Sequence, residues 1–242
     1  MSSWLERWDA VLAGHFPGRD QEFELALTVI QRLVGRPKKL VDLACGPGSL
    51  ALRAARRFPE AEILGVDLDP VLLEIARGAA GSERVRFVDG DLLDPGWSRP
   101  LGEVDVICAT AALHYLDPAE LPRLAGILAD GVRVDGVVLI SDTFRIGVPR
   151  LDSMVGDLRR RALSAHETAA HEGETWSSWW SAVAAEPAFA DLLRLRDQRL
   201  GSGYEGLTAT LDEAVETLRQ AGFAEVAPIR QDVGNFLLVA IR

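Results

Sequence analysis

The sequence contains little cysteine, no long apolar run and fewer basic than acidic residues. Two cysteines among 242 residues, Cys45 and Cys108, are too few for a disulfide framework, which indicates a reducing, cytoplasmic setting. No stretch approaches the roughly 18 apolar residues of a membrane span, and the N-terminus lacks the basic-then-apolar pattern of a signal peptide. The 26 Lys and Arg residues against 36 Asp and Glu residues give a formal net charge of −10. This balance argues against a nucleic-acid partner, because contacts with phosphates need a cationic face.

The remaining composition is that of an ordinary globular domain. Hydrophobic residues make up 48% of the chain and charged residues 26%. A length of 242 residues suffices for one α/β domain with a sizeable core and an insertion. We expect a protein that needs neither a membrane nor a nucleic acid and that acts as a monomer or a homodimer.

The chain is organised around residues 40–52, which read as a strand, a glycine turn and a helix. Residues 40–43 are apolar except Asp42, as in a strand buried on both faces of a parallel sheet. Gly46 and Gly48 then interrupt the strand before a helix-forming run. Glycine lacks a Cβ atom, so a ligand can approach the backbone there and face the N-terminus of the helix. This is the front half of a nucleotide-binding βαβ unit.

Two classes of cofactor use this geometry. Gly46, Gly48 and Ala51 satisfy the dinucleotide pattern G-x-G-x-x-G/A. Asp67 follows about 20 residues later, where a ribose-binding acid belongs. Asp42 distinguishes the two classes, because its fixed negative charge would repel the pyrophosphate of a dinucleotide. A ligand with an ammonium group and no phosphate suits this carboxylate better.

The run Asp42-Leu-Ala-Cys-Gly-Pro-Gly resembles the first motif of the class I methyltransferases that depend on S-adenosylmethionine (SAM). Ala44 stands where many members have a first glycine, which is a mild departure unless that position requires a positive φ. The resemblance covers about residues 40–142 and 208–242. It implies a Rossmann-like α/β fold with a seven-stranded, mostly parallel sheet and a C-terminal antiparallel hairpin. It also implies SAM as the cofactor and S-adenosylhomocysteine as its product.

A second strand is expected over residues 61–67, ending at Asp67. Asp67 is well placed there to accept hydrogen bonds from both ribose hydroxyls of the cofactor. The alternative is that Asp67 only caps the following helix, but Asp69 already offers a cap in front of Pro70.

A third short strand over residues 85–88 is followed by Asp91 and Leu92. By resemblance to the family, Asp91 accepts the adenine amino group and Leu92 lies against the ring. Acids therefore follow three successive strands, and this constellation is the strongest signal in the sequence. The expected cofactor-binding residues are Asp42, Ala44, Cys45, Gly46, Gly48, Asp67, Leu68, Asp91, Leu92 and Thr110.

A fourth strand over residues 104–109 leads to Thr110, His114 and Tyr115. In open α/β sheets, ligands bind in the crevice beyond the strand ends, so Thr110 is expected beside the cofactor and His114 near the methyl donor's reactive end. His114 either takes a proton from the acceptor, as histidine can near neutral pH, or is a hydrogen-bonded structural residue of the loop. Tyr115 is expected to wall the pocket, because an unperturbed phenol stays protonated.

Residues 1–38 are expected to form an N-terminal helical flap. Trp4, Trp8 and Leu12 recur every four residues and share one helix face. That face either packs on the sheet domain or forms an aromatic flap over the active site. His15 and Phe16 lie beside a Pro-Gly turn and are candidate substrate contacts.

The boundaries expected for the rest of the chain are a core of residues 39–142 and 208–242, interrupted by a helical lid or substrate cap at 143–207. The insertion contains Trp176, Trp179 and Trp180 on one helix face. These indoles form the core of the cap, a wall facing the ligand, or both. Trp176 and Trp180 are therefore candidate substrate contacts.

No metal site is expected. His166 and His171 resemble a zinc motif, but they lie five residues apart. On a helix, this separation makes the two imidazoles point in directions about 140° apart. Asp142 follows a fifth expected strand at 137–141, and it is the one residue for which a magnesium ligand role stays an alternative.

The predicted function is methyl transfer from SAM to an oxygen, nitrogen or carbon atom of a small-molecule acceptor, of the kind found in natural-product tailoring. The reaction is an in-line displacement, with nucleophile and methyl held at about 3 Å. Two alternatives stay open: an NAD-dependent oxidoreductase on a similar sheet, and a SAM-binding cyclase or regulator that transfers no methyl group.

Overall fold

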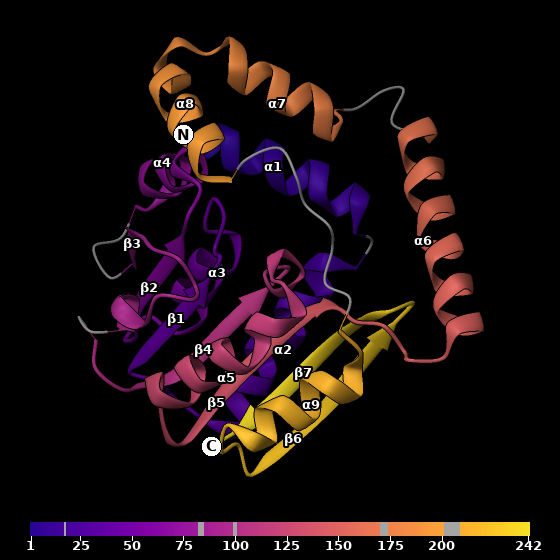
Figure 1. Cartoon of the computed structure of the whole chain (residues 1–242). Helices are drawn as coiled ribbons and strands as arrows, with labels where there is room; N and C mark the ends of the chain where they lie inside the picture. The colour runs from indigo at the N-terminus through magenta and orange to yellow at the C-terminus, as the bar shows by residue number, and fades with distance from the viewer. Residues whose placement is uncertain (17, 82–84, 99–100, 170–173, 201–208) are drawn as a thin grey trace.

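The computed structural model describes the chain of 242 residues except 17, 82–84, 99–100, 170–173 and 201–208, and the side chains of residues 15, 98 and 162–169 are also outside the description. The described chain forms a seven-stranded sheet of order β3-β2-β1-β4-β5-β7-β6 (Figure 1). Strands β1 to β5 are parallel, and β7 runs antiparallel between β5 and β6. This is the predicted mostly parallel sheet with a C-terminal hairpin.

The strands are β1 (Lys39–Leu43), β2 (Glu62–Asp67), β3 (Val85–Asp89), β4 (Val104–Thr110), β5 (Val132–Thr143), β6 (Glu225–Asp232) and β7 (Asn235–Ile241). The helices are α1 (Ser2–His15), α2 (Arg19–Leu33), α3 (Ser49–Arg57), α4 (Pro70–Ala79), α5 (Leu121–Gly131), α6 (Pro149–Ala169), α7 (Trp176–Ala185), α8 (Ala190–Leu200) and α9 (Leu211–Gln220). Short 3-10 turns lie at η1 (Pro95–Ser98), η2 (Leu113–Tyr115), η3 (Pro118–Glu120) and η5 (Pro187–Phe189).

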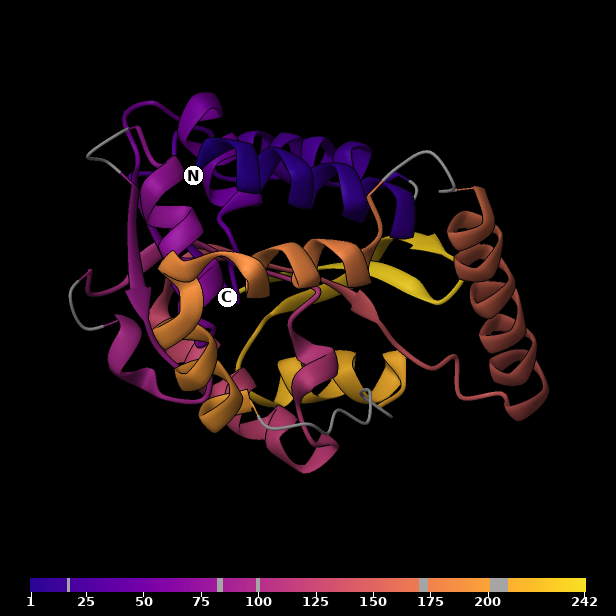
Figure 2. The ribbon, with the colours of Figure 1, turned by 90° about the horizontal axis from the view of Figure 1, so that it is seen from above.

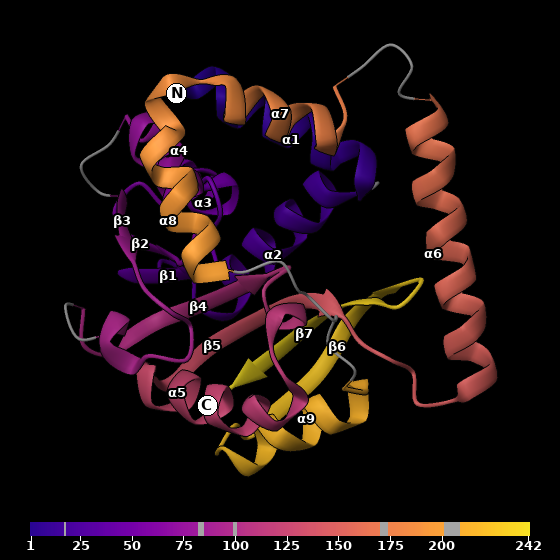
Figure 3. The same cartoon turned by 45° about the horizontal axis from the view of Figure 1, so that its top comes forward.

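Helices cover both faces of the sheet, because neighbouring residues of a buried strand point to opposite sides. Leu40 belongs to an apolar core shared with α2 and α3, and Val41 belongs to a second core shared with α5 and α9. The two helix pairs lie on opposite sides of the sheet (Figures 1 and 3). Helix α2 contributes its buried apolar side chains, among them Phe23 and Ile30, to the first of these cores.

The strand order reverses between β1 and β4, which are neighbours in the sheet although β2 and β3 lie between them in the sequence. In such sheets the connections on either side of the reversal lead away from each other, which opens a crevice at the carboxyl ends of the strands. The glycine turn after β1 and the loop after β4 flank this crevice.

A third apolar core joins the start of the chain to the insertion. Trp8 of α1, Trp179 of α7 and Phe189 of η5 are buried together against Val71 and Ile75 of α4. Figure 2 shows α1 and α7 lying along one another, with α8 following. The two segments expected as a separate flap and lid thus pack together. Helix α6 lies beside the turn between β6 and β7 (Figure 1) and also contacts α1.

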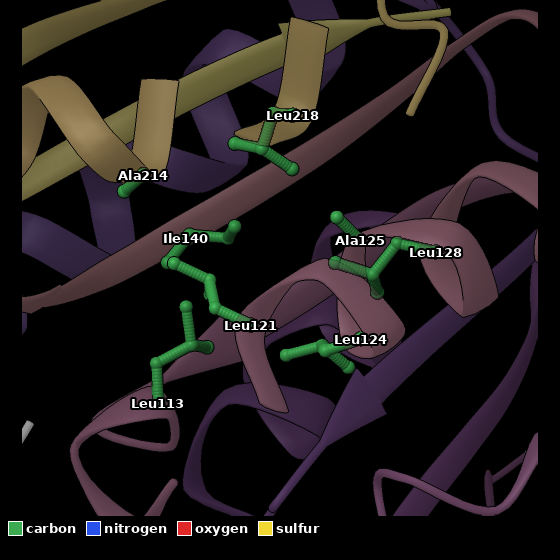
Figure 4. A pocket seen from close by; sticks show the side chains of 8 residues that line it. All are labelled: Leu113, Leu121, Leu124, Ala125, Leu128, Ile140, Ala214 and Leu218. Atoms are coloured by element: carbon green, nitrogen blue, oxygen red, sulfur yellow. The ribbon is translucent and has the colours of Figure 1, made fainter. Parts of the chain in front are cut away.

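The gap between α5, β5 and α9 is a feature of core packing. Figure 4 shows its apolar lining, in which every side chain is a leucine, an isoleucine or an alanine. It has no room for a water molecule, so it is not a ligand site. The lining residues are Leu113, Leu121, Leu124, Ala125, Leu128, Ile140, Ala214 and Leu218.

Candidate active site

The turn after β1 has a left-handed backbone at three positions. The φ angles of Ala44, Gly46 and Gly48 are +54°, +55° and +89°. The two glycines adopt these angles without a Cβ clash, whereas an L-residue such as Ala44 is destabilised by about 1–2 kcal/mol there. The position of Ala44 therefore requires a positive φ, and its departure from the glycine of the family is not neutral. Helix α3 begins directly after Gly48.

Asp42 is the most deeply buried carboxylate at this turn, with 1% of the residue exposed. Its Oδ2 accepts a hydrogen bond from the Ala51 backbone N–H at 3.0 Å. Its Oδ1 is buried and has no hydrogen-bond partner among the described residues. Burial raises the pKa of Asp42 to about 7, and the nearby charge of Asp67 adds to the rise. A buried carboxylate oxygen without a donor is complemented by an ammonium group, so the turn fits SAM better than a pyrophosphate.

Asp67 connects the end of β2 to the glycine turn. Its two oxygens accept hydrogen bonds from the backbone N–H groups of Gly46 at 2.7 Å and of Asp69 at 2.8 Å. Burial raises the pKa of Asp67 to about 6. Asp69 caps α4 by accepting from the backbone of Val71 and Leu72, as the sequence predicts. A carboxylate has about four acceptor sites, so Asp67 can still accept from the two hydroxyls of a ribose.

The loop after β3 carries the two residues predicted to bind adenine. Asp91 is exposed, and its Oδ1 accepts from the Leu93 N–H at 2.8 Å, which fixes the turn. Leu92 is half-buried and packs on the core beneath α5. Their contacts with adenine remain a prediction, as do the contacts of Leu68 and Thr110 with the cofactor. Cys45 and Cys108 are buried, and burial raises the pKa of both thiols well above its usual value.

The loop after β4 is held by an acid of β5. Asp142 is 2% exposed, and its Oδ2 accepts from three successive backbone N–H groups. These donors belong to Ala112, Leu113 and His114. Its Oδ1 lies 2.9 Å from Nδ1 of His114. A proton on Nδ1 can be donated to this carboxylate, which leaves Nε2 as the basic nitrogen of a neutral imidazole.

This pairing was not predicted from the sequence, where Asp142 was considered only as a metal ligand. Strand β5 is the neighbour of β4 in the sheet, with Thr110 opposite Ser141. The sequence signal for this pair is an acid at the end of one strand and a histidine after the neighbouring strand. This signal can be recognised only when the order of the strands in the sheet is known. Among the described residues, no group of three or more His, Cys, Asp or Glu side chains is arranged to hold a metal. The predicted absence of a site at His166 and His171 falls on side chains outside the description.

Tyr115 extends the same loop toward the insertion. Its ring centroid lies 4.3 Å from that of His114. Desolvation raises the pKa of the Tyr115 phenol although the residue is 62% exposed, and the charges of Asp67 and Asp142 raise it further, while Arg196 opposes them. The phenol therefore stays protonated at neutral pH. Charges from β2, β5 and α8 all act on this one hydroxyl.

The tryptophans of α7 have different environments. Trp179 is fully buried, Trp180 is half-buried and Trp176 is 39% exposed. All three contact the indole of Trp8, at centroid distances between 5.0 and 6.4 Å. Of the two interpretations of α1, the structure supports packing, because Trp8 is buried in the third core. Phe16, at the end of α1, is 45% exposed, and the His15 side chain lies outside the described part.

Two arginines of α8 reach the strand ends. Arg196 donates from Nε to Asp69 at 2.6 Å. Arg199 donates from Nη1 to Asp89 at 2.7 Å and to the carbonyl of Leu68 at 3.2 Å. The insertion is thus tied to the loops on either side of Asp67. Nothing in the local sequence of α8 distinguishes these two arginines from solvent-exposed ones.

Comparisons with known proteins agree with this geometry. The family described as "Methyltransferase domain" matches residues 40–136. A trans-aconitate 2-methyltransferase of Methylobacterium radiotolerans is 32% identical over 217 residues, which cover 88% of this chain and 72% of the relative. Among the described residues, no helix is long and apolar enough to cross a membrane.

Solved structures share the fold at low sequence identity. Magnesium protoporphyrin IX methyltransferase from Synechocystis has a TM-score of 0.62 and 15% identity over 100% of this chain and 95% of its own. A putative O-methyltransferase from Nostoc punctiforme has a TM-score of 0.58 and 18% identity over 92% of this chain, which spans 56% of that one. The sheet order, the glycine turn and the Methylobacterium relative together place the chain in the class I SAM-dependent methyltransferases, with SAM as its cofactor.

Proposed function

We propose that the protein transfers a methyl group from SAM to a small-molecule acceptor and that His114 takes the proton of the attacking group. The observation that carries this proposal is the contact of 2.9 Å between Nδ1 of His114 and the buried Asp142. The name of the Methylobacterium relative, which refers to a small organic acid, supports an acceptor of small size. The net charge of −10 supports the absence of a nucleic-acid substrate.

The cofactor would be held by the residues around the glycine turn. Bound SAM supplies an electrophilic methyl group on a sulfonium, which becomes a neutral thioether on transfer. Asp42 would pair with the ammonium group through its unpartnered Oδ1, and Gly46 and Gly48 would admit the ligand close to the backbone. Asp67 would accept from the ribose hydroxyls. Asp91, with Leu92, would hold the adenine.

His114 and Asp142 would act as a base and its positioning residue. In the neutral state, Nδ1–H donates to Asp142 and Nε2 accepts the proton that leaves the acceptor hydroxyl or amine. The acceptor atom gains the methyl carbon as it loses this proton. The resulting imidazolium is stabilised by the carboxylate 2.9 Å away. Such a positioned base contributes roughly 10²–10⁴-fold to the rate.

The test measures methyl transfer by mass spectrometry over a panel of small acceptors that carry a hydroxyl or an amino group, each with and without a carboxylate elsewhere in the molecule. With the best acceptor, we expect His114→Gln to lower kcat by about 10²–10⁴-fold and to leave the Kd for SAM unchanged. Asp142→Asn should cause a similar loss. The double variant should be no slower than the slower single variant, because residues that act as one unit are not additive.

The pH–rate profile separates a base from a merely structural histidine. An imidazole base produces a rate that rises with pH within the range of about 5 to 8. With SAM saturating at each pH, so that the titration of Asp42 and Asp67 does not affect the rate through cofactor binding, we expect this rise in the wild-type protein and its loss in both single variants. Retention of the rise in His114→Gln, or additive effects in the double variant, would contradict the assignment. Binding of SAM without transfer to any acceptor would favour the alternative of a regulator or cyclase.

A further inference from the structure

The guanidinium of Arg196 is held from two sides at the edge of the candidate site. Its Nε donates to Oδ2 of Asp69 at 2.6 Å, and its central carbon lies 4.2 Å from the ring centroid of Trp180. Asp69 is itself fixed, because its other oxygen caps α4. The Arg196 side chain is 28% exposed. Two rigid neighbours thus orient a half-buried cation before any ligand binds.

This arrangement leaves most of the guanidinium donors for a ligand. Arginine carries five N–H donors in a planar fork, and the contact with Asp69 uses only the one on Nε. Among the described residues, Asp69 is the sole hydrogen-bond partner of Arg196. The two terminal nitrogens together form the face that binds a carboxylate through two parallel hydrogen bonds. Arg199, one turn further along α8, instead uses its terminal nitrogen on Asp89 and the Leu68 carbonyl.

Arg196 and the proposed base lie at the same edge of the sheet. Arg196 is bound to Asp69, which follows the carboxyl end of β2, and His114 follows the carboxyl end of β4, which runs parallel to β2. That edge also carries Tyr115, whose ring centroid lies 4.3 Å from that of His114. Desolvation and neighbouring carboxylates raise the pKa of this phenol, and the charge of Arg196 opposes them. Arg196 is therefore a cation whose charge acts where an acceptor beside Tyr115 would lie.

We propose that Arg196 binds a carboxylate of the methyl acceptor, so that the acceptor is a small organic acid whose reacting group lies at the His114 end of the site. This inference rests on the proposed function. Arg196 touches the substrate and determines specificity, but it takes no part in the bond exchange. A carboxylate held there would also offset the positive charge that SAM brings to the site.

The test is calorimetric titration of the full-length protein saturated with S-adenosylhomocysteine. The probes are salicylate, malate and trans-aconitate, each beside its neutral amide. We expect at least one acid to bind at least tenfold more tightly than its amide, which equals about 1.4 kcal/mol. Arg196→Gln should abolish this preference and leave the affinity for S-adenosylhomocysteine unchanged. Arg196→Lys should retain part of it, since a lysine keeps the charge without the planar fork.

The matched control is Arg194→Gln on the same helix, where the side chain is 72% exposed and, within the described part of the chain, pairs only with Asp191 one turn away. It should leave every affinity unchanged. The inference would be overturned if the wild-type protein bound acids and amides equally. It would also be overturned if Arg196→Gln lost the same affinity for acids as for amides, because Arg196 would then only anchor the insertion. In that case, methyl transfer to neutral acceptors would still support the proposed function. The proposed function itself would be contradicted if no acceptor were methylated.

Discussion

Asp42 and Asp67 are two buried carboxylates that the cofactor-free protein holds at a cost. Burial raises their pKa values to about 7 and about 6, against about 3.9 for an ordinary aspartate. Between pH 4 and pH 7 the unfolded chain therefore releases these protons before the folded protein does. Stability from the two groups is complete below about pH 4 and is lost as pH rises through the folded pKa values. A bound cation offsets this loss, which links cofactor binding to pH.

Asp42→Asn tests this linkage. Asparagine keeps an oxygen that can accept from the Ala51 N–H but has no charge to lose. As the pH rises from 4 to 7.5, we expect the thermal midpoint of the cofactor-free wild-type protein to decrease relative to that of the variant. The expected decrease is at least about 3 °C. For a chain of this size, that corresponds to roughly 1 kcal/mol. The measurement is the difference between the two melting curves at each pH, since titrating groups away from Asp42 and Asp67 contribute equally to both. Parallel curves would contradict the cited pKa shifts.

At the scale of elements, α7 presents its indoles to two different surroundings. Trp179 belongs to the third core, whereas Trp176 is 39% exposed and contacts Trp8 and Trp180 at its edge. The sequence predicted a helix face shared by all three indoles, and a split between core and ligand wall was one of its interpretations. The structure places Trp179 in the core, whereas the ligand-facing role of Trp176 and Trp180 remains a prediction.

Trp176→Ala tests whether the exposed edge of this helix face contacts the methyl acceptor. We expect the KM for the acceptor to rise about five- to tenfold, which is roughly 1–1.4 kcal/mol, while the Kd for SAM stays the same. Steady-state kinetics with the acceptor varied at saturating SAM measure the first quantity, and calorimetry measures the second. The exposed Leu151→Ala of α6 is a control that removes apolar surface elsewhere. An unchanged KM for the acceptor would contradict the predicted contact between Trp176 and the acceptor.

At the scale of the whole molecule, the third core ties the N-terminal helix and the insertion to the sheet domain. Trp8, Trp179 and Phe189 pack on Val71 and Ile75 of α4, which begins directly after the loop that follows β2. The arginine contacts of α8 add polar links at the same place. The predicted domain boundaries at 38 and 143 thus separate segments that share one core.

Trp179→Ala tests this shared core. Removing a fully buried indole should lower the free energy of unfolding by about 3–5 kcal/mol, in a single transition, because the core includes α4 of the sheet domain. Trp176→Ala is the matched comparison on the same helix, and its effect should be smaller because its ring is partly exposed. Urea unfolding followed by circular dichroism gives both values. Two separate transitions, with helix lost before the sheet domain unfolds, would show instead that the insertion is an independent unit.

Much of the fold follows from local chemistry. The N-cap at Asp69 and the capping boxes at Asp117 with Glu120 and at Thr210 with Glu213 depend on residues three positions apart or fewer, and all are present. Strand β5 begins five residues earlier than predicted, at Val132, because Arg133 and Asp135 interrupt the apolar pattern that marks a buried strand.

The chemistry at the glycine turn could also be predicted, in part. The dinucleotide pattern of Gly46, Gly48 and Ala51 fits an NAD-dependent oxidoreductase equally well, and that alternative is wrong. Asp42 supplied the reason, since a carboxylate at this turn disfavours phosphate and favours an ammonium group. The strain at Ala44 could not be predicted, because a residue's φ depends on how the turn is held by Asp67 from the next strand.

The sequence by itself determined the class of the protein, because periodicity, caps and the acids that follow successive strands act over short separations. Only the tertiary structure decided which distant groups work as pairs. His114 and Asp142 are 28 residues apart, and Arg196 and Asp69 are 127 apart. Each pair forms because the strand order and the third core bring elements that are distant in the sequence to one edge of the sheet, and a local sequence pattern contains no information about such a contact.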